Sequence, residues 1–99
     1  MKRKYDLNFS GPFLKQAKKL IKRNPDLAKR VNKVIAILKC DPFYQGLKTH
    51  KVESKLYGFA HSSRVTKDVR IIWNFNGEVA TILDILDIGG HSGKGKVYK

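Results

Sequence analysis

Apolar side chains at every second position from Val69 to Phe75 restrict the fold more than any other feature. In an extended strand, alternate side chains share a face, so Ile71 and Trp73 lie on one side and Arg70 on the other. Burying an arginine is costly, and Arg70 should therefore face a groove or an anion. The segment predicts a strand with one apolar face for the core and a second face that carries Arg70 together with Ile72 and Asn74.

The overall charge suggests which anion this is. Twenty-one Lys and Arg residues against eight Asp and Glu give a formal net charge of +13. Such a surface favours a polyanionic partner, and nucleic acid comes before an anionic membrane because no amphipathic helix rich in Trp or Phe stands out. A phosphate is thus the expected anion.

The cysteines, histidines and apolar runs of the sequence indicate its cellular compartment and whether it binds a metal. Cys40 is the only cysteine, which excludes an intrachain disulfide and suits a reducing compartment. No signal-peptide core and no apolar run of membrane-spanning length is present, so we expect a cytoplasmic protein without membrane contact. The three histidines and Cys40 lack metal-ligand spacing, so no metal site is predicted.

The first half of the chain predicts a strand and two helices. Tyr5–Phe9 alternates as a short strand, and Ser10-Gly11-Pro12 is a helix start with a capping hydroxyl. Asn24-Pro25-Asp26 ends the first helix and starts a second, which Asp41-Pro42 ends. The short connection predicts an antiparallel helical hairpin.

The second half predicts three further strands. Residues 43–58 look irregular, whereas 59–65, 69–75 and 79–88 read as strands, with Asn76-Gly77 as a hairpin signal and Gly89-Gly90 as the end. Residues 1–99 are thus expected to form one α+β domain of order β-α-α-β-β-β. Its helices would cover one face of a three-stranded antiparallel meander and the N-terminal strand.

Three segments carry a family resemblance. Leu47–Val52, Ser62–Trp73 and Asp84–His91 resemble, in this order, segments of the RelE/ParE superfamily of toxin–antitoxin toxins. The similarity is greatest to mRNA interferases of the RelE, YoeB and YafQ type and covers nearly the whole chain. Each segment alone is only moderately specific for this superfamily. The three in this order, together with the expected fold, are strong support for the resemblance.

The resemblance implies a RelE-like fold and a reaction. Such toxins bind the ribosome, contact mRNA and ribosomal RNA, and cleave mRNA without a metal or small-molecule cofactor. The ribose 2′-hydroxyl attacks the adjacent phosphate and gives a 2′,3′-cyclic phosphate and a free 5′-hydroxyl. This endoribonuclease chemistry requires a base, cations for the developing phosphorane charge and an acid. A cognate acidic antitoxin is the implied protein partner.

The resemblance also implies roles for single residues. Arg70 matches the strand arginine that stabilises the phosphate, although it would be an ordinary surface residue if paired with Asp68 or Asp84. Arg64 takes the place of a histidine or arginine in the preceding strand, or is simply solvated. His91 matches the histidine or arginine at the end of the last strand, where it would exchange protons unless it is merely exposed.

Three more residues complete the predicted catalytic set. His50 matches the histidine of the Leu-Lys-x-His segment, and His61 lies in the strand where RelE-like members carry lysines. Tyr98 would be the C-terminal aromatic that stacks on a base, but it lies seven residues beyond His91 and departs from the usual spacing. RNA-binding roles are expected for five lysines: Lys48, Lys51, Lys67, Lys94 and Lys96.

Two other functions stay open. A ParE-like toxin would share the scaffold, lack the interferase residues and inhibit DNA gyrase. A degenerate toxin would bind RNA or an antitoxin without cutting. The arginines and histidine in the predicted catalytic strands favour the nuclease, whereas the displaced Tyr98 keeps the degenerate toxin possible.

Overall fold

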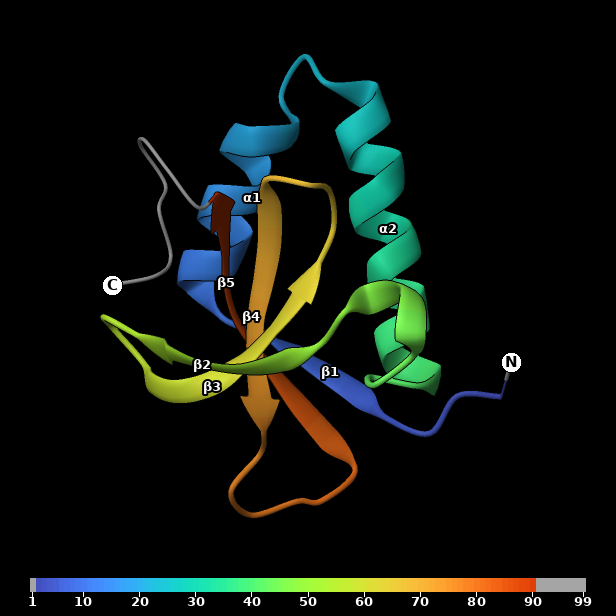
Figure 1. The fold of residues 1–99 in the computed structure, drawn as a ribbon, viewed down its shortest axis with the longest axis vertical. Helices are drawn as coiled ribbons and strands as arrows, with labels where there is room; N and C mark the ends of the chain where they lie inside the picture. Colours follow the sequence, from blue (N-terminus) through green and yellow to red (C-terminus); the bar gives the residue numbers. More distant parts are fainter. Residues whose placement is uncertain (1, 91–99) are drawn as a thin grey trace.

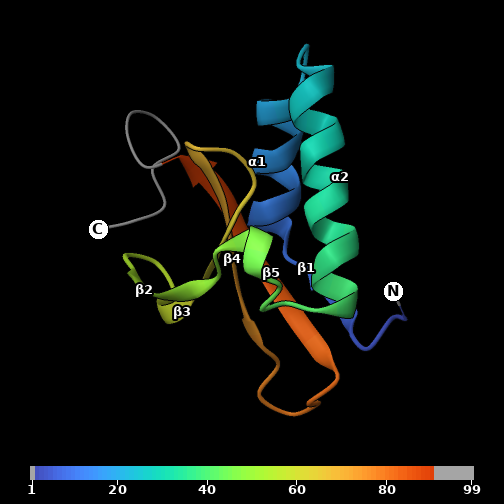
Figure 2. The ribbon, with the colours of Figure 1, turned by 45° about the vertical axis from the view of Figure 1, so that its right-hand side comes forward.

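Two helices pack against one face of a five-stranded mixed sheet in the computed structural model, which describes residues 2–90 (Figures 1 and 2). The elements are β1 (Asp6–Phe9), α1 (Gly11–Ile21), α2 (Pro25–Cys40), the short 3-10 helix η1 (Gln45–Leu47), β2 (His50–Ser54), β3 (Gly58–Arg64), β4 (Val69–Phe75) and β5 (Ile82–Gly90). Neither α-helix in this part of the chain is long and apolar enough to cross a membrane.

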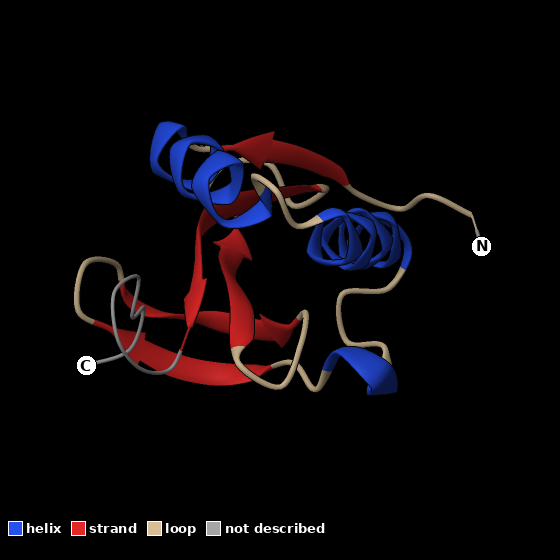
Figure 3. Ribbon diagram, turned by 90° about the horizontal axis from the view of Figure 1, so that it is seen from above, coloured by secondary structure: helices blue, strands red, loops and turns tan. Residues whose placement is uncertain are grey.

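Both helices begin where their capping residues predict. The Ser10 hydroxyl accepts a hydrogen bond from the Phe13 backbone N–H (3.0 Å), and the Asn24 side chain accepts one from the Leu27 N–H (3.1 Å). Ser10 also donates to the Leu86 carbonyl (2.7 Å) and so ties the start of α1 to β5. The predicted helical hairpin is confirmed, with its two helices side by side on the sheet (Figure 3).

The sheet is larger than the predicted meander. Its order is β1-β5-β4-β3-β2, with β1 parallel to β5 and every other neighbouring pair antiparallel. The additional strand is β2, which lies within the segment 43–58 that was wrongly predicted to be irregular. Only Val52 among its five residues is strongly apolar, so no alternation marks it, and pairing with β3 makes it a strand.

The ends of β5 also differ from the prediction. The hairpin at Asn76-Gly77 exists, but the Asn76 side chain accepts hydrogen bonds from the Glu78 and Val79 N–H groups (both 2.9 Å). This side-chain turn lengthens the loop, and β5 starts at Ile82 rather than at residue 79. The strand then runs through Gly90, which pairs with Val69, instead of ending before Gly89.

The predicted alternation in β4 is confirmed. Ile71 and Trp73 are fully buried in the main core beneath the helices. Ile72 is buried on the opposite face, where it forms a second, smaller cluster with Ala60. The register between β4 and β5 shifts after Ile72, because Leu86 is an extra residue in β5. The sheet therefore has apolar residues on both faces, and the face away from the helices also carries charged side chains.

Candidate active site

Two arginines lie directly opposite each other on the face away from the helices. Arg64 of β3 pairs in register with Arg70 of β4, and both side chains are half-buried. On its other side Arg70 is opposite Gly89, which has no side chain to cover it. Like charges in directly opposite positions destabilise a sheet, by about 0.2–1 kcal/mol. An anion bound between them would remove this repulsion, so the pair forms a candidate phosphate site.

The strand register excludes one alternative role for Arg70, that of a surface residue paired with Asp84. Asp84 is opposite Asn74, four residues along β4 from Arg70, or roughly 13 Å at strand spacing. Its carboxylate accepts hydrogen bonds from the amides of Asn8 and Asn76 (both 3.1 Å). Asp84 is therefore too far away to be the partner of Arg70.

His50 lies on the same face as the two arginines. It is opposite Ser62 in β3, two residues before Arg64, and its side chain is exposed. The ring Nδ1 lies 3.0 Å from the Lys48 carbonyl oxygen. A carbonyl only accepts, so in the neutral ring Nδ1 carries the hydrogen and Nε2 offers a lone pair to solvent. This arrangement suits a general base.

The backbone before His50 adopts an unusual conformation. Lys48 has a φ of 49°, in the left-handed region that residues other than glycine seldom adopt. Such a conformation persists only where the surrounding structure holds it. Here it directs the Lys48 carbonyl to the His50 ring. The strained backbone at Lys48 therefore helps to orient a candidate base.

A chain of hydrogen bonds anchors this segment to the core. The buried Trp73 indole donates to the Ser63 hydroxyl (2.8 Å), which lies 2.7 Å from the Thr49 hydroxyl. Thr49 donates its one hydrogen to the Pro42 carbonyl (2.7 Å), so Ser63 must be the donor to Thr49. The chain joins β4 and β3 to the loop after α2, and it passes through Thr49, the residue directly before His50.

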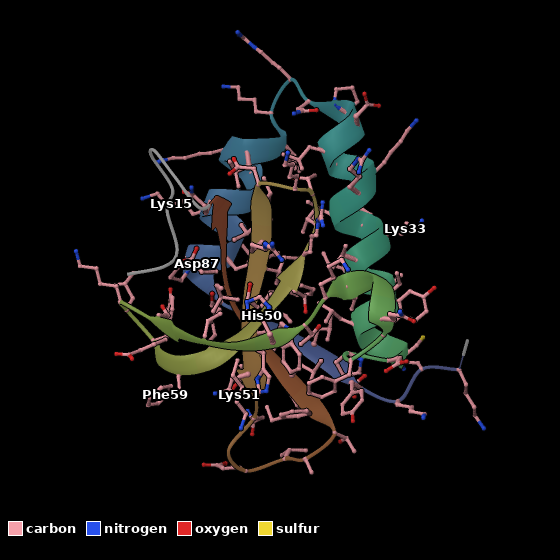
Figure 4. The ribbon with its side chains drawn as sticks, in the orientation of Figure 1. Lys15, Lys33, His50, Lys51, Phe59 and Asp87 are labelled. Atoms are coloured by element: carbon pink, nitrogen blue, oxygen red, sulfur yellow. The ribbon has the colours of Figure 1, made fainter. Side chains whose placement is uncertain are left out.

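Two residues that sequence reasoning missed lie on this face as well. Asp87 of β5 is opposite Ile72, and the Tyr57 hydroxyl lies 3.5 Å from its Oδ2. Burial, and then the neighbouring Asp87 carboxylate, raise the pKa of Tyr57, so the phenol keeps its proton at neutral pH. The only sequence signal was that Asp87 interrupts an apolar strand. Figure 4 shows Asp87 and His50 on the same side of β2 and β3.

The structure separates His61 from this group. His61 is opposite Trp73 on the face toward the helices, and the two rings stack with centroids 4.6 Å apart. Burial lowers the pKa of His61, and the nearby Lys51 charge lowers it further. Its Nδ1 is buried without a hydrogen-bond partner. The structure therefore does not bring His61 together with Arg64 and Arg70, because the sheet lies between them.

The predicted lysines also divide between the two faces. Lys48 is exposed beside His50, whereas Lys51 is opposite His61 in the register and points away from the arginine face (Figure 4). Lys67 is exposed in the turn between β3 and β4. Four further candidates lie outside the described residues: His91, Lys94, Lys96 and Tyr98. Among residues 2–90, no three of His, Cys, Asp and Glu gather as ligands for a metal.

Known structures share this architecture. No family model and no curated protein matches the chain. A chain of the E. coli DinJ–YafQ complex is 22% identical, with 88% of this chain and 93% of that chain covered and a TM-score of 0.69. A copper-bound mutant toxin from Helicobacter pylori is 24% identical, with 88% and 94% covered and a TM-score of 0.68. A chain of the RelE–RelB complex from Pyrococcus horikoshii is 18% identical, with 90% and 97% covered and a TM-score of 0.66. The motif resemblance is thus confirmed at the level of the fold, and the chain has the fold of the RelE, YoeB and YafQ toxins.

Proposed function

We propose that this protein is the toxin of a toxin–antitoxin pair and acts as a ribosome-associated endoribonuclease on mRNA. The observation that carries the proposal is the Arg64–Arg70 pair, two cations in register on the sheet face away from the helices, with His50 on the same face. The net charge of +13 and the fold of known toxins support it.

Each group has a distinct task in the proposed reaction. Arg64 and Arg70 bind the scissile phosphate and stabilise the charge that develops on it. His50 Nε2 takes the proton from the 2′-hydroxyl, whose oxygen attacks phosphorus and forms the cyclic phosphate. The P–O5′ bond breaks, and the 5′-oxygen needs a proton to leave as a hydroxyl. His91 is our candidate for this acid.

An acidic antitoxin is the proposed protein partner. Structures with the same fold occur in complexes named DinJ–YafQ and RelE–RelB. The excess of cationic side chains here would be complementary to an acidic protein. We place the pair in the cytoplasm, where the ribosome and mRNA are available.

Induced expression tests the proposal. The wild type should halt translation and leave mRNA fragments with 5′-hydroxyl ends, mapped by ligation-based sequencing. Arg70→Ala should reduce cleavage by roughly 10²–10³-fold, as expected for the loss of one group that stabilises a developing charge. Lys29→Ala removes the same charge from an exposed position on α2 and should cleave like the wild type.

Purified protein separates the remaining alternatives. Cleavage of ribosome-bound mRNA but not of free mRNA would support action on the ribosome. Growth arrest with intact mRNA and poisoned DNA gyrase would instead identify a ParE-like toxin. Antitoxin binding without any cleavage would identify a degenerate toxin.

A further inference from the structure

A groove between α2 and the segment around η1 is lined by three cationic residues. Its volume is about 580 Å³, and it is lined by Arg30 and Lys33 of α2, Arg64 of β3, and Tyr44, with buried aliphatic residues at its base. No acidic side chain is among its described lining residues. Arg30 and Lys33 are three residues apart on one helix face, so their charges lie side by side. The groove is therefore a concave, strongly cationic surface.

Tyr44 gives this surface an exposed aromatic ring. Its side chain is 46% exposed, and a Cβ at Gly46 would lie only 2.8 Å from its Cε2 atom. The Tyr44 ring thus packs against the Gly46 backbone, and any larger residue at position 46 would push the ring away. An exposed ring beside cations is the combination that binds single-stranded nucleic acid, because bases stack on the ring and phosphates meet the cations.

Arg64 connects the groove to the candidate active site. It is the last residue of β3 and is among the residues that line the groove, and it is also the direct cross-strand neighbour of Arg70. We infer that the groove binds the RNA strand flanking the cleaved bond, with phosphates at Arg30 and Lys33 and a base on Tyr44. The inference rests on the proposed function for its substrate. An acidic peptide would also meet the cations, but continuity with the Arg64–Arg70 phosphate site and the exposed ring favour RNA.

Fluorescence anisotropy with a labelled 2′-O-methyl oligouridine tests the groove, because this probe lacks the attacking hydroxyl and remains intact. Titrations across a range of salt concentrations compare the wild type with Arg30→Gln/Lys33→Gln. The control Lys15→Gln/Lys18→Gln removes two charges at the same helical spacing from exposed positions on α1. Lys15 and Lys33 lie on opposite sides of the molecule in Figure 4.

We expect the groove variant to bind more weakly at low salt. The slope of log K against log salt should fall in magnitude by about 1.4, since each phosphate contact on a single strand contributes about 0.7. The control pair should keep the wild-type slope. Tyr44→Ala should bind the probe about fivefold more weakly or worse, whereas Tyr44→Phe should bind like the wild type, as expected for stacking.

Several results would contradict the inference that the groove binds RNA. These are wild-type protein that does not bind the probe, equal losses in the groove and control variants, or a Tyr44→Ala variant with unchanged affinity. A groove variant that loses affinity for poly-glutamate but not for the RNA probe would identify a site for an acidic peptide instead. Thermal melts of each variant establish that it is folded.

The groove and the proposed nuclease function can fail separately. If the wild type cleaves mRNA but the groove variant binds RNA like the control, only the groove inference is wrong. If no cleavage occurs with or without ribosomes while the groove variant shows the expected salt slope, the groove binds RNA and the nuclease proposal is wrong.

Discussion

Replacing Ser63 with alanine should destabilise the protein strongly, although only one oxygen atom is removed. Ser63 and Trp73 are both fully buried, and the Ser63 hydroxyl is the acceptor for the Trp73 indole N–H. Without it the indole donor has no partner and no access to water, which costs about 1–3 kcal/mol. A loss of about 2 kcal/mol corresponds to a fall in Tm of roughly 8–16 °C for a domain of this size.

Urea unfolding is the appropriate assay. Ser63→Ala should shift the midpoint to lower urea with an unchanged m-value, because the surface exposed on unfolding stays the same. Thr49→Val keeps the Trp73–Ser63 bond and should cost less, about 1 kcal/mol. The double variant should lose less than the sum, since the Ser63–Thr49 bond is shared. A Ser63→Ala loss below about 0.5 kcal/mol, or strict additivity, would refute the hydrogen-bond chain.

Three further predictions concern single charges and a helix cap. Arg64→Gln should raise the unfolding free energy by about 0.5 kcal/mol at low salt through relief of its repulsion with Arg70; Lys67→Gln, with the same charge change in a turn, should not, and equal gains would contradict the pairing. His61 has a lowered pKa, so the native state binds fewer protons than the unfolded state and stability falls as pH drops below 6.5; His61→Phe should flatten this dependence in melts at pH 5 and 7.5, and an unchanged pH profile would contradict it. Asn24→Ala should cost about 1 kcal/mol in urea unfolding through loss of the α2 cap, and an unchanged midpoint would show that the cap does not matter.

The sequence predicted the elements whose local signals are strong. The Ser10 hydroxyl and the Asn24 side-chain oxygen accept hydrogen bonds from backbone N–H groups of the following turn. Each helix start therefore depends on a few adjacent residues. The alternation in β4 likewise follows from burial of Ile71 and Trp73 on one side. That Arg64 and Arg70 lie opposite each other follows only from the pairing of β3 with β4.

What could not be predicted depends on contacts distant in sequence. β2 exists because its backbone pairs with β3, and its own residues carry almost no strand pattern. His61 seemed a reasonable catalytic partner by residue type, but only the pairing with Trp73 shows which face it occupies. The approach of Tyr57 to Asp87 spans thirty residues and left no local signal beyond a carboxylate in an apolar strand.

The parallel pairing of β1 with β5 has a consequence for the order of folding during synthesis. Asp6 to Phe9 align with Ile82 to Ile85, so one strand from each end of the described chain must meet. Contacts of such high sequence separation form late and slow folding, because a long loop must close first. β5 is also a neighbour of β4, the strand that carries Arg70. The sheet therefore cannot be completed until residue 90 has left the ribosome. A growing chain therefore cannot assemble the complete sheet around the arginine face early, which delays any activity of that face until β5 has been synthesised and has left the ribosome.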